Sequence, residues 1–362
     1  MHKSFIINAI QLQQNNSTNY DNLVTNKNFP LILNTTWFRL SLVKEIMNMK
    51  KLNVTLAILV AAVMAGNAQT TATSDVVGYS KVSVPSGTRA VVPGFVKSAV
   101  FTGVGTITSQ SLSASDLAAN ALKPTSFTDG RPNYPTHYIE ITSGAYEGYS
   151  FDVSSNSATS VSVSGLPSAL NGTQVNYVIR PHLTLGDIDS SNLPDGNVVL
   201  NIFNNPSTPA VTYLYDSAGA WYDGNGNYLM NHVVIYPGTG ISLNNTSGSF
   251  SITFSGSVKS TKTAVPVYKN AAVNLVGPMN PSTSTTLTAW SAPLPTDTVA
   301  NILSSTGNNG VSLTLLTDIG STILYDGNGN ELTSTSIEGQ NALSMSAMTQ
   351  DGYAIFKSPL QQ

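Results

Sequence analysis

Short runs in which polar and apolar residues alternate make up most of the sequence from about residue 75 onward. Clear examples are residues 80–84, 138–142, 159–164 and 249–254. Because successive side chains of a β-strand point to opposite faces, this period of two predicts strands that bury one face. Gly, Pro, Asn and Asp separate the runs at short intervals, as the turns of sandwiches and barrels require. The sequence therefore predicts an all-β fold built from β-sandwich or β-barrel-like modules.

Helical patterning is confined to two short segments of the chain. Residues 115–122 have the spacing of one short helix, and Ser115 stands where an N-cap residue is expected. Residues 298–303 show a weaker helical pattern. We therefore expect few short helices in an otherwise all-β chain.

One hexapeptide occurs twice in the sequence. Tyr-Asp-Gly-Asn-Gly-Asn stands at residues 222–227 and again at residues 325–330, 103 residues further on. A looser echo links residues 86–93, continuing to Val104-Gly105, with residues 260–266, continuing to Val276-Gly277. Solenoid repeats are about 20–50 residues long, so this spacing favours duplication of a domain. The alternative is that two unrelated hairpin turns have converged on the same residues.

The repeat leads to an expected domain organisation. We expect a first β-module at residues 75–258, which is interrupted by a small β insertion at about residues 133–182. A second, related β-module follows at residues 259–362.

Residues 49–68 have the three parts of a secretory signal peptide. Met-Lys-Lys is followed by an apolar run at residues 52–64 and by small residues up to Ala68. The apolar run is too short for a membrane-spanning helix, which needs about 20 residues. We therefore expect a secreted or cell-surface protein that begins near Gln69 and meets the membrane only through its signal peptide.

Residues 1–48 precede this signal, although a signal peptide belongs at the N-terminus. The simplest interpretation is that translation starts at Met49 or Met47, and that residues 1–48 are an over-extended start without folded structure. The alternative is a signal-anchor with a cytoplasmic N-terminal tail.

The charge of the expected mature chain is low in density and negative in sign. Charged residues are 10% of the sequence, against about 25% in an ordinary soluble protein. Of the 16 basic and 19 acidic residues, 10 and 17 follow residue 68, so the mature net charge is −7. This balance argues against nucleic-acid binding, which needs clustered Lys and Arg. Since the chain has no cysteine, it forms no disulfide and performs no thiol chemistry.

Three phrases of the sequence resemble a known group of proteins when they are taken in order. They are residues 75–79 (Asp-Val-Val-Gly-Tyr), residues 138–148 and residues 179–186 (Ile-Arg-Pro-His-Leu-Thr-Leu-Gly). In this order they resemble a family of exported β-rich proteins found in Verrucomicrobia. The resemblance covers about residues 75–290. The family has no assigned activity, so the resemblance implies export and all-β architecture and supplies no site residue.

The repeated hexapeptide also has the spacing of a calcium loop. Oxygen ligands at positions 1, 3 and 5 of such a loop correspond to Asp223, Asn225 and Asn227 in the first copy, and to Asp326, Asn328 and Asn330 in the second. The twelfth position lacks the usual Glu, since it is Val234 or Ile337. We therefore predict hairpin turns, which favour Asn-Gly and Asp-Gly, with weak calcium binding as the alternative and no other cofactor.

Aromatic residues are the candidate ligand-binding groups. Tyr146 and Tyr149 lie in the expected insertion, and Trp221 and Tyr222 lie beside the first hexapeptide. Aromatic faces flanked by Asn and Asp can stack on sugars, but they can equally fill a core or pair across strands.

Titratable residues give no recognisable catalytic motif. Glu140 and Asp152 could face each other across a hairpin as the carboxylates of a glycosidase do, but a solvated strand face is the favoured interpretation. His137, His182 and His232 lack metal-ligand spacing and are expected at strand edges or in packing contacts. No catalytic residue is therefore assigned.

These observations favour a non-enzymatic structural or adhesive protein outside the cell. Its partners would be other copies of the chain, joined through sheet edges, or a polysaccharide. A carbohydrate-binding module is the alternative function, and a polysaccharide-acting hydrolase is the third.

Overall fold

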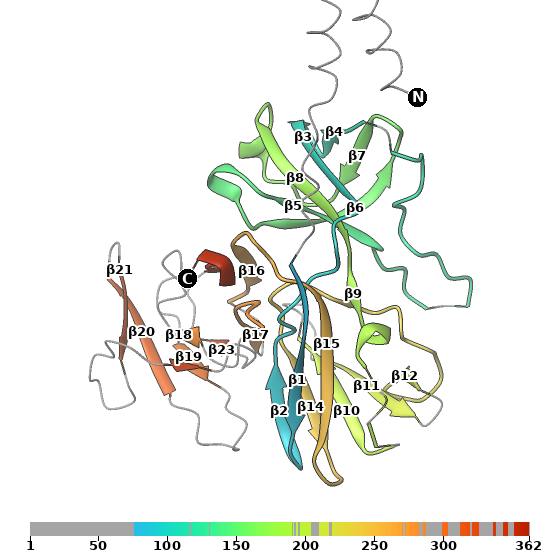
Figure 1. Cartoon of the computed structure of the whole chain (residues 1–362), viewed down its shortest axis with the longest axis vertical. Helices are drawn as coiled ribbons and strands as arrows, with labels where there is room; N and C mark the ends of the chain where they lie inside the picture. The colour runs from blue at the N-terminus through green and yellow to red at the C-terminus, as the bar shows by residue number, and fades with distance from the viewer. Residues whose placement is uncertain are drawn as a thin grey trace, which may run out of the picture. The chain divides into compact units, whose positions relative to one another are not determined.

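The computed structural model describes part of the chain (Figure 1). It covers residues 76–361, apart from residues 116, 130, 190, 192, 195, 270 and 272 and the segments 204–209, 217–218, 282–284, 287–298, 303–311, 319–320, 326–335, 338–342 and 347–350. The signal peptide predicted at residues 49–68 and the segment 1–48 therefore lie outside the described residues.

Strands dominate the described residues, and the all-β prediction is confirmed. The helices described are single 3-10 turns of three residues each: η1 (Gly144–Tyr146), η2 (Ser168–Leu170), η3 (Leu185–Asp187) and η5 (Pro359–Gln361). Both helices predicted from the sequence are wrong. The segment 119–122 forms turns, and residues 299–302 form a strand that pairs with two neighbours, because sheet pairing outweighs a weak local helical preference.

Six strands close into a small barrel in the order β3-β4-β7-β6-β5-β8. Their bounds are β3 (Phe101–Thr108), β4 (Ser111–Ser113), β5 (His137–Ile141), β6 (Ser150–Asn156), β7 (Ser160–Val163) and β8 (Gln174–Pro181). Alternate side chains such as Ile139, Phe151 and Ile179 fill its interior, because the faces of a strand alternate. The intervening residues, including Glu140 and Asp152, therefore lie on the outer face of the barrel.

The other strands form two sets. The first set lies on both sides of the barrel in the sequence and contains β1 (Val77–Val84), β2 (Gly87–Val91), β9 (Leu183–Thr184), β10 (Val198–Ile202), β11 (Val211–Asp216), β12 (Ala220–Asp223), β13 (Val234–Ile235), β14 (Ile241–Asn245) and β15 (Phe250–Ser257). The second set contains β16 (Thr263–Val267), β17 (Asn274–Val276), β18 (Thr285–Thr286), β19 (Val299–Ile302), β20 (Ser312–Asp318), β21 (Ser321–Tyr325), β22 (Ser336–Ile337), β23 (Leu343–Ser346) and β24 (Gly352–Phe356).

Both sets follow one pairing scheme in the described residues. The first forms a sheet in the order β12-β11-β10-β14-β2 with the pairs β1-β15 and β13-β9. The second forms a sheet in the order β21-β20-β19-β23-β17 with the pairs β16-β24 and β18-β22. Taken in chain order, β1 thus corresponds to β16, β2 to β17, and β9–β15 to β18–β24. The same architecture occurs twice, with the barrel strands between β2 and β9 of the first copy.

The pairing scheme places the hexapeptide in the same position in both sets. Residues 222–227 start at the end of β12, and residues 325–330 start at the end of β21, which are the third strands of equivalent meanders. The looser echo, however, is wrong by one strand. It matches residues 86–93, which contain β2, with residues 260–266, although β16 corresponds to β1. The domain limits predicted from the sequence stay a prediction.

The core of the first strand set is continuous and apolar. Trp221 and Leu243 are 1% and 0% exposed and pack with Val84, Leu200 and Phe254 in one cluster. Full burial of each such side chain stabilises the fold by about 1.5–3 kcal/mol. This core holds β13 and the segment after it, which carries one wall of the cavity described next.

Candidate functional site

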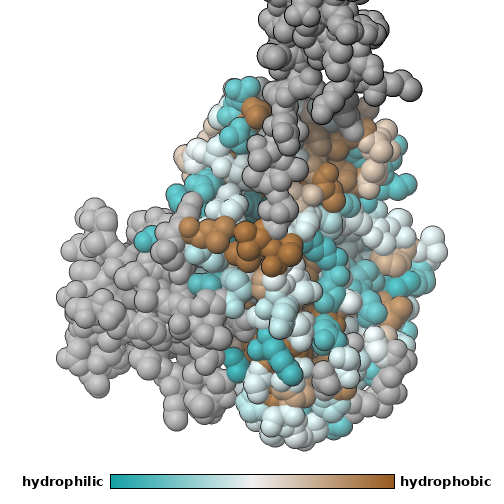
Figure 2. Space-filling view, in the orientation of Figure 1, coloured by the Kyte–Doolittle hydropathy of each residue, from teal (hydrophilic) through white to brown (hydrophobic). Residues whose placement is uncertain are grey.

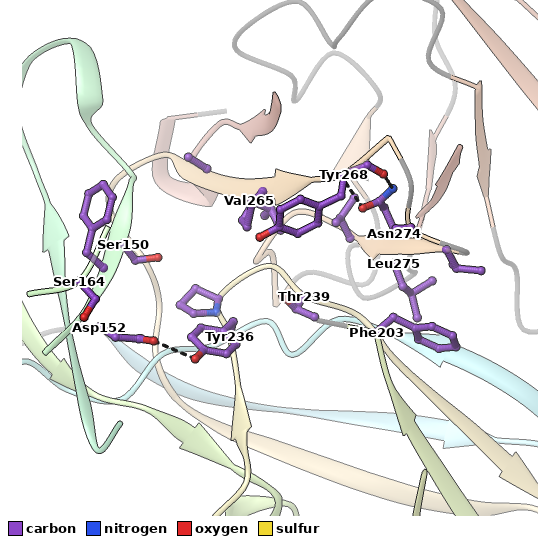
Figure 3. A pocket seen from close by; sticks show the side chains of 17 residues that line it. Ser150, Asp152, Ser164, Phe203, Tyr236, Thr239, Val265, Tyr268, Asn274 and Leu275 are labelled. Carbon is purple, nitrogen blue, oxygen red and sulfur yellow. Dashed lines mark hydrogen bonds between the residues drawn. The ribbon is translucent and has the colours of Figure 1, made fainter. Parts of the chain in front are cut away.

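A cavity of about 280 Å³ is the candidate site (Figure 3). Residues of five segments line it: the start of β6, Ser164 after β7, Phe203 after β10, the turn after β13 and the stretch from β16 to β17. Ser150 and Asp152 come from β6, and Tyr236 follows β13. Tyr268 follows β16, so residues far apart in the sequence meet in one concave space.

Asp152 is the centre of a hydrogen-bond network at one end of the cavity. The Tyr236 hydroxyl donates to Asp152 Oδ2 at 2.9 Å, as Figure 3 shows. The second oxygen, Oδ1, lies 3.0 Å from Nε2 of His182. Strand register explains the meeting, because Asp152 is opposite Tyr138, which in turn is opposite Arg180 of β8, and His182 follows at the end of that strand.

His182 is enclosed by aromatic rings. Its side chain is 1% exposed, and its ring centroid lies 4.8 Å from that of Tyr138 and 5.2 Å from that of Tyr236. Nδ1 of His182 has no hydrogen-bond partner among the described residues. A buried N–H without an acceptor is costly. We therefore place a ring proton on Nε2, which donates to Asp152.

Two tyrosines supply hydroxyl groups to the cavity. Burial, together with the nearby carboxylate of Asp152, raises the pKa of Tyr236 far above its ordinary value. Burial also raises the pKa of Tyr268, with a smaller effect from Asp351. Both hydroxyls therefore stay protonated at neutral pH and can donate hydrogen bonds. Figure 3 shows the Tyr268 hydroxyl directed toward the side of the cavity that holds Asp152.

Asn274 fixes the position of Tyr268. Its Oδ1 accepts from the Tyr268 backbone N–H at 2.8 Å, and its Nδ2 donates to the Tyr268 carbonyl at 2.9 Å. The Asn274 side chain is thus used inside the protein and is not offered to a ligand. Because both backbone groups of Tyr268 are held, the position of its side chain is preorganised, which lowers the entropy cost of binding.

Glu140 and Asp152 share the outer face of the barrel but have different surroundings. Glu140 is opposite Ser150, and Asp152 is opposite Tyr138. Glu140 is 1% exposed, and its oxygens lie 2.9 Å from Lys259 Nζ and 3.2 Å from Arg180 Nε. The prediction of a solvated strand face is therefore wrong for Glu140, because Lys259 and Thr261 pack against this carboxylate.

The aromatic residues predicted to bind a ligand lie outside the cavity lining. Tyr146 and Tyr149 are half-buried and meet edge to face with centroids 5.2 Å apart. Tyr149 also contacts Tyr353 of β24 at 4.5 Å. Tyr222 is half-buried in β12, opposite Leu214.

The prediction that Trp221 binds a ligand is wrong. It is 1% exposed and packs on Tyr215 with ring centroids 5.2 Å apart. Since its ring is part of the core, it offers no face on which a sugar could stack. Proximity to the hexapeptide turn was a misleading signal, because Trp221 belongs to the inward-facing register of β12.

The first hexapeptide forms a turn closed by its own aspartate. Asp223 Oδ1 accepts the backbone N–H groups of Asn227 at 2.6 Å and of Tyr228 at 2.9 Å. Gly226 has φ of +74°, a conformation that favours glycine. Asn225 and Asn227 are exposed. The second loop, with Asp326, Asn328 and Asn330, lies outside the described residues, and weak calcium binding stays a prediction.

Sequence reasoning missed most of the cavity residues. Asp152 was noticed as a carboxylate, and His182 was expected in a packing contact, but Tyr236 and Tyr268 were not selected. Tyr236 and Tyr268 each follow the end of a strand, and they precede a proline and a lysine, respectively. This pattern matches no recognisable motif.

Comparisons with known proteins give no assignment. No protein-family model matches the sequence, no curated protein matches it, and no solved structure matches the fold. In the described part of the chain, no helix has the length and hydropathy of a membrane-spanning segment. In the same part, no three His, Asp or Glu residues are placed to hold a metal ion.

Proposed function

We propose that this chain is an exported adhesive protein that binds a saccharide in the cavity beside Asp152 and does not hydrolyse it. The observation that carries the proposal is the combination of two tyrosine rings and a carboxylate in one concave space. Sugars present apolar ring faces and a rim of hydroxyl donors and acceptors. Tyr236 and Tyr268 offer ring faces, and Tyr268 also offers a hydroxyl donor. Asp152 offers acceptor oxygens.

The size of the cavity favours one sugar unit. Pockets for drug-sized ligands have volumes of about 300–1,000 Å³, and this cavity has about 280 Å³. A hexose has about 12 non-hydrogen atoms, and about 0.3 kcal/mol per atom gives a binding free energy near −4 kcal/mol. We therefore expect a Kd of about 1 mM for a single unit.

Binding without hydrolysis is favoured by the number of carboxylates. Glycoside hydrolysis canonically uses two carboxyl groups on opposite sides of the scissile bond. The described lining of the cavity contains Asp152 as its one carboxylate. The neighbouring Glu140 is held by Lys259 and Arg180 and does not line the cavity.

The test is a binding titration of the exported chain with monosaccharides and disaccharides, followed by NMR or calorimetry. Tyr268→Ala should weaken binding at least tenfold, because one ring wall and one hydroxyl are lost. Tyr222→Ala is the matched control, since Tyr222 is a half-buried tyrosine outside the lining. Equal affinity in both variants, or turnover of a glycoside by the wild type, would contradict the proposal.

A structural role in assembly is the second candidate function. β1 pairs with β15, and its outer edge has no partner strand among the described residues. Val77 and Tyr79 of β1 are 68% and 77% exposed, and Figure 2 shows apolar patches among the hydrophilic residues of the side in view. Free edges promote pairing between chains. Light scattering tests this candidate, since Tyr79→Lys should shift an oligomer to the monomer.

A further inference from the structure

Asp152 is the one charged residue in the described lining of the cavity. The other described lining residues are hydroxylated, aromatic, aliphatic or amide-bearing, with Asn274 turned to the backbone of Tyr268. The Asp152 side chain is 31% exposed, so a ligand in the cavity can reach its carboxylate. Asp152 therefore brings the one formal charge to the described lining, and that charge is negative.

His182 is the nearest titratable neighbour of the carboxylate, and its Nε2 lies 3.0 Å from Asp152 Oδ1. Its Nδ1 has no hydrogen-bond partner among the described residues. The rings of Tyr138 and Tyr236 cover the imidazole and exclude water from it. Asp152 thus accepts from the His182 N–H and from the Tyr236 hydroxyl, and it is the one charged group in the described lining.

The hydrogen bonds of Asp152 leave space for donors of a ligand. An ionised carboxylate has about four acceptor positions, and the two bonds to His182 and Tyr236 use one on each oxygen. The remaining positions can be filled by donors alone. A hydroxyl brings a donor, an ammonium brings donors and the opposite charge, and a carboxylate of the ligand brings only repulsion.

We propose that the cavity takes a sugar unit with a protonated amino group, whose ammonium contacts Asp152, and that it excludes uronic acids. This inference rests on the proposed saccharide-binding function and names its substrate class. The rings of Tyr236 and Tyr268, which flank the space in Figure 3, add a cation–π attraction when the ammonium lies over a ring face.

The experiment compares three monosaccharides that differ mainly in charge. Glucosamine, glucose and glucuronate are titrated into the exported chain at pH 6 and low salt, where glucosamine is protonated. A charge-assisted hydrogen bond in a partly exposed site corresponds to about a tenfold difference in affinity. We expect glucosamine to bind about tenfold more tightly than glucose, and glucuronate to bind more weakly than either.

Asp152→Asn is the matching variant, because it keeps the shape of the side chain and removes its charge. It should abolish the preference for glucosamine while glucose still binds. Equal binding of glucosamine and glucose by the wild type would overturn this inference and leave the saccharide function intact. Binding of propylammonium as tightly as glucosamine, without any binding of glucose, would instead overturn the saccharide function and keep the preference for a cation. Binding of none of the probes would overturn both.

A measurement on the wild type covers the case in which Asp152→Asn does not fold. The attraction between an ammonium and a partly exposed carboxylate is screened by salt. The affinity for glucosamine should therefore decrease as NaCl rises from low concentration to 0.5 M, whereas the affinity for glucose should stay constant. A glucosamine affinity that does not respond to salt would contradict the contact with Asp152.

Discussion

Lys259 Nζ lies 2.9 Å from Glu140 Oε1, and each of the two side chains is 1% exposed. Glu140 belongs to β5 of the barrel, whereas Lys259 lies between β15 and β16. The second carboxylate oxygen lies 3.2 Å from Arg180 Nε, and Thr261 donates to Oε1. Burial disfavours the ionised carboxyl, but Lys259 and Arg180 together hold the pKa of Glu140 below its ordinary value. This buried cluster therefore ties the barrel to the start of the second strand set.

Removal of one cation from this cluster should be strongly destabilising. Lys259→Met should lower the free energy of unfolding by about 3–5 kcal/mol, because Glu140 then loses one of its two buried cationic partners. The measurement is unfolding in urea. Lys262→Met is the control, since Lys262 pairs with Glu147 at 3.7 Å and is 37% exposed. That pair should contribute less than about 1 kcal/mol, and equal losses in the two variants would refute a special role for the buried cluster.

The buried tyrosines should make the fold sensitive to alkali. Burial raises the pKa of Tyr177 to about 12, and its hydroxyl donates to the Ser113 carbonyl in the barrel. Since the folded pKa lies above the unfolded value of about 10, the stability from this group is present below pH 10 and is lost as pH rises toward 12. At pH 11, phenolate absorbance should increase on unfolding in urea, and Tyr177→Phe should reduce the increase. If the rise in phenolate absorbance on unfolding is the same in Tyr177→Phe and in the wild type, Tyr177 is already ionised in the folded chain.

Asp223 should stabilise its turn whether or not calcium is present. Asp223→Ala removes the acceptor of two backbone N–H groups and should cost about 1–2 kcal/mol, as the loss of a helix cap does. Thermal unfolding with calcium and with a chelator measures the effect. If calcium raises the melting temperature of the wild type and not that of Asp223→Ala, the turn is a calcium site as well.

The strands could be predicted from the sequence because their signal is local. Residues 80–84 and 249–254 alternate in polarity, and they pair with each other as β1 and β15. The repeated hexapeptide likewise pointed to two related sets of strands, since both copies follow equivalent meander strands. The period of two identifies the face of a side chain but not what covers that face. Glu140 was therefore expected in solvent, although other segments bury it.

The candidate site could not be predicted because its residues meet only after folding. Asp152, Tyr236 and Tyr268 belong to three segments, and no spacing in the sequence relates them. The barrel register places Asp152 near His182, and Asn274 fixes Tyr268 through contacts six residues apart. Trp221 shows the opposite error. Its place beside the hexapeptide turn led to the prediction of a ligand-binding role, but its side chain is buried in the core.

Gly148 should be essential where the β5–β6 hairpin meets β16. Its φ is +93°, its carbonyl accepts the Ala264 N–H at 3.1 Å, and a Cβ at this position would overlap the carbonyl oxygen of Lys262. Gly144 in the same hairpin has φ of +76° but has open space where a Cβ would lie. Gly144→Ala should cost only the conformational strain of about 1–2 kcal/mol, whereas Gly148→Ala should cost more, because the hairpin must also move away from β16.

Since β6 and β16 both line the cavity, Gly148→Ala should in addition weaken saccharide binding, and Gly144→Ala should leave it unchanged. Thermal unfolding and a sugar titration of both variants measure the two effects, and equal behaviour of the two glycines would show that the contact with Lys262 does not hold the cavity together.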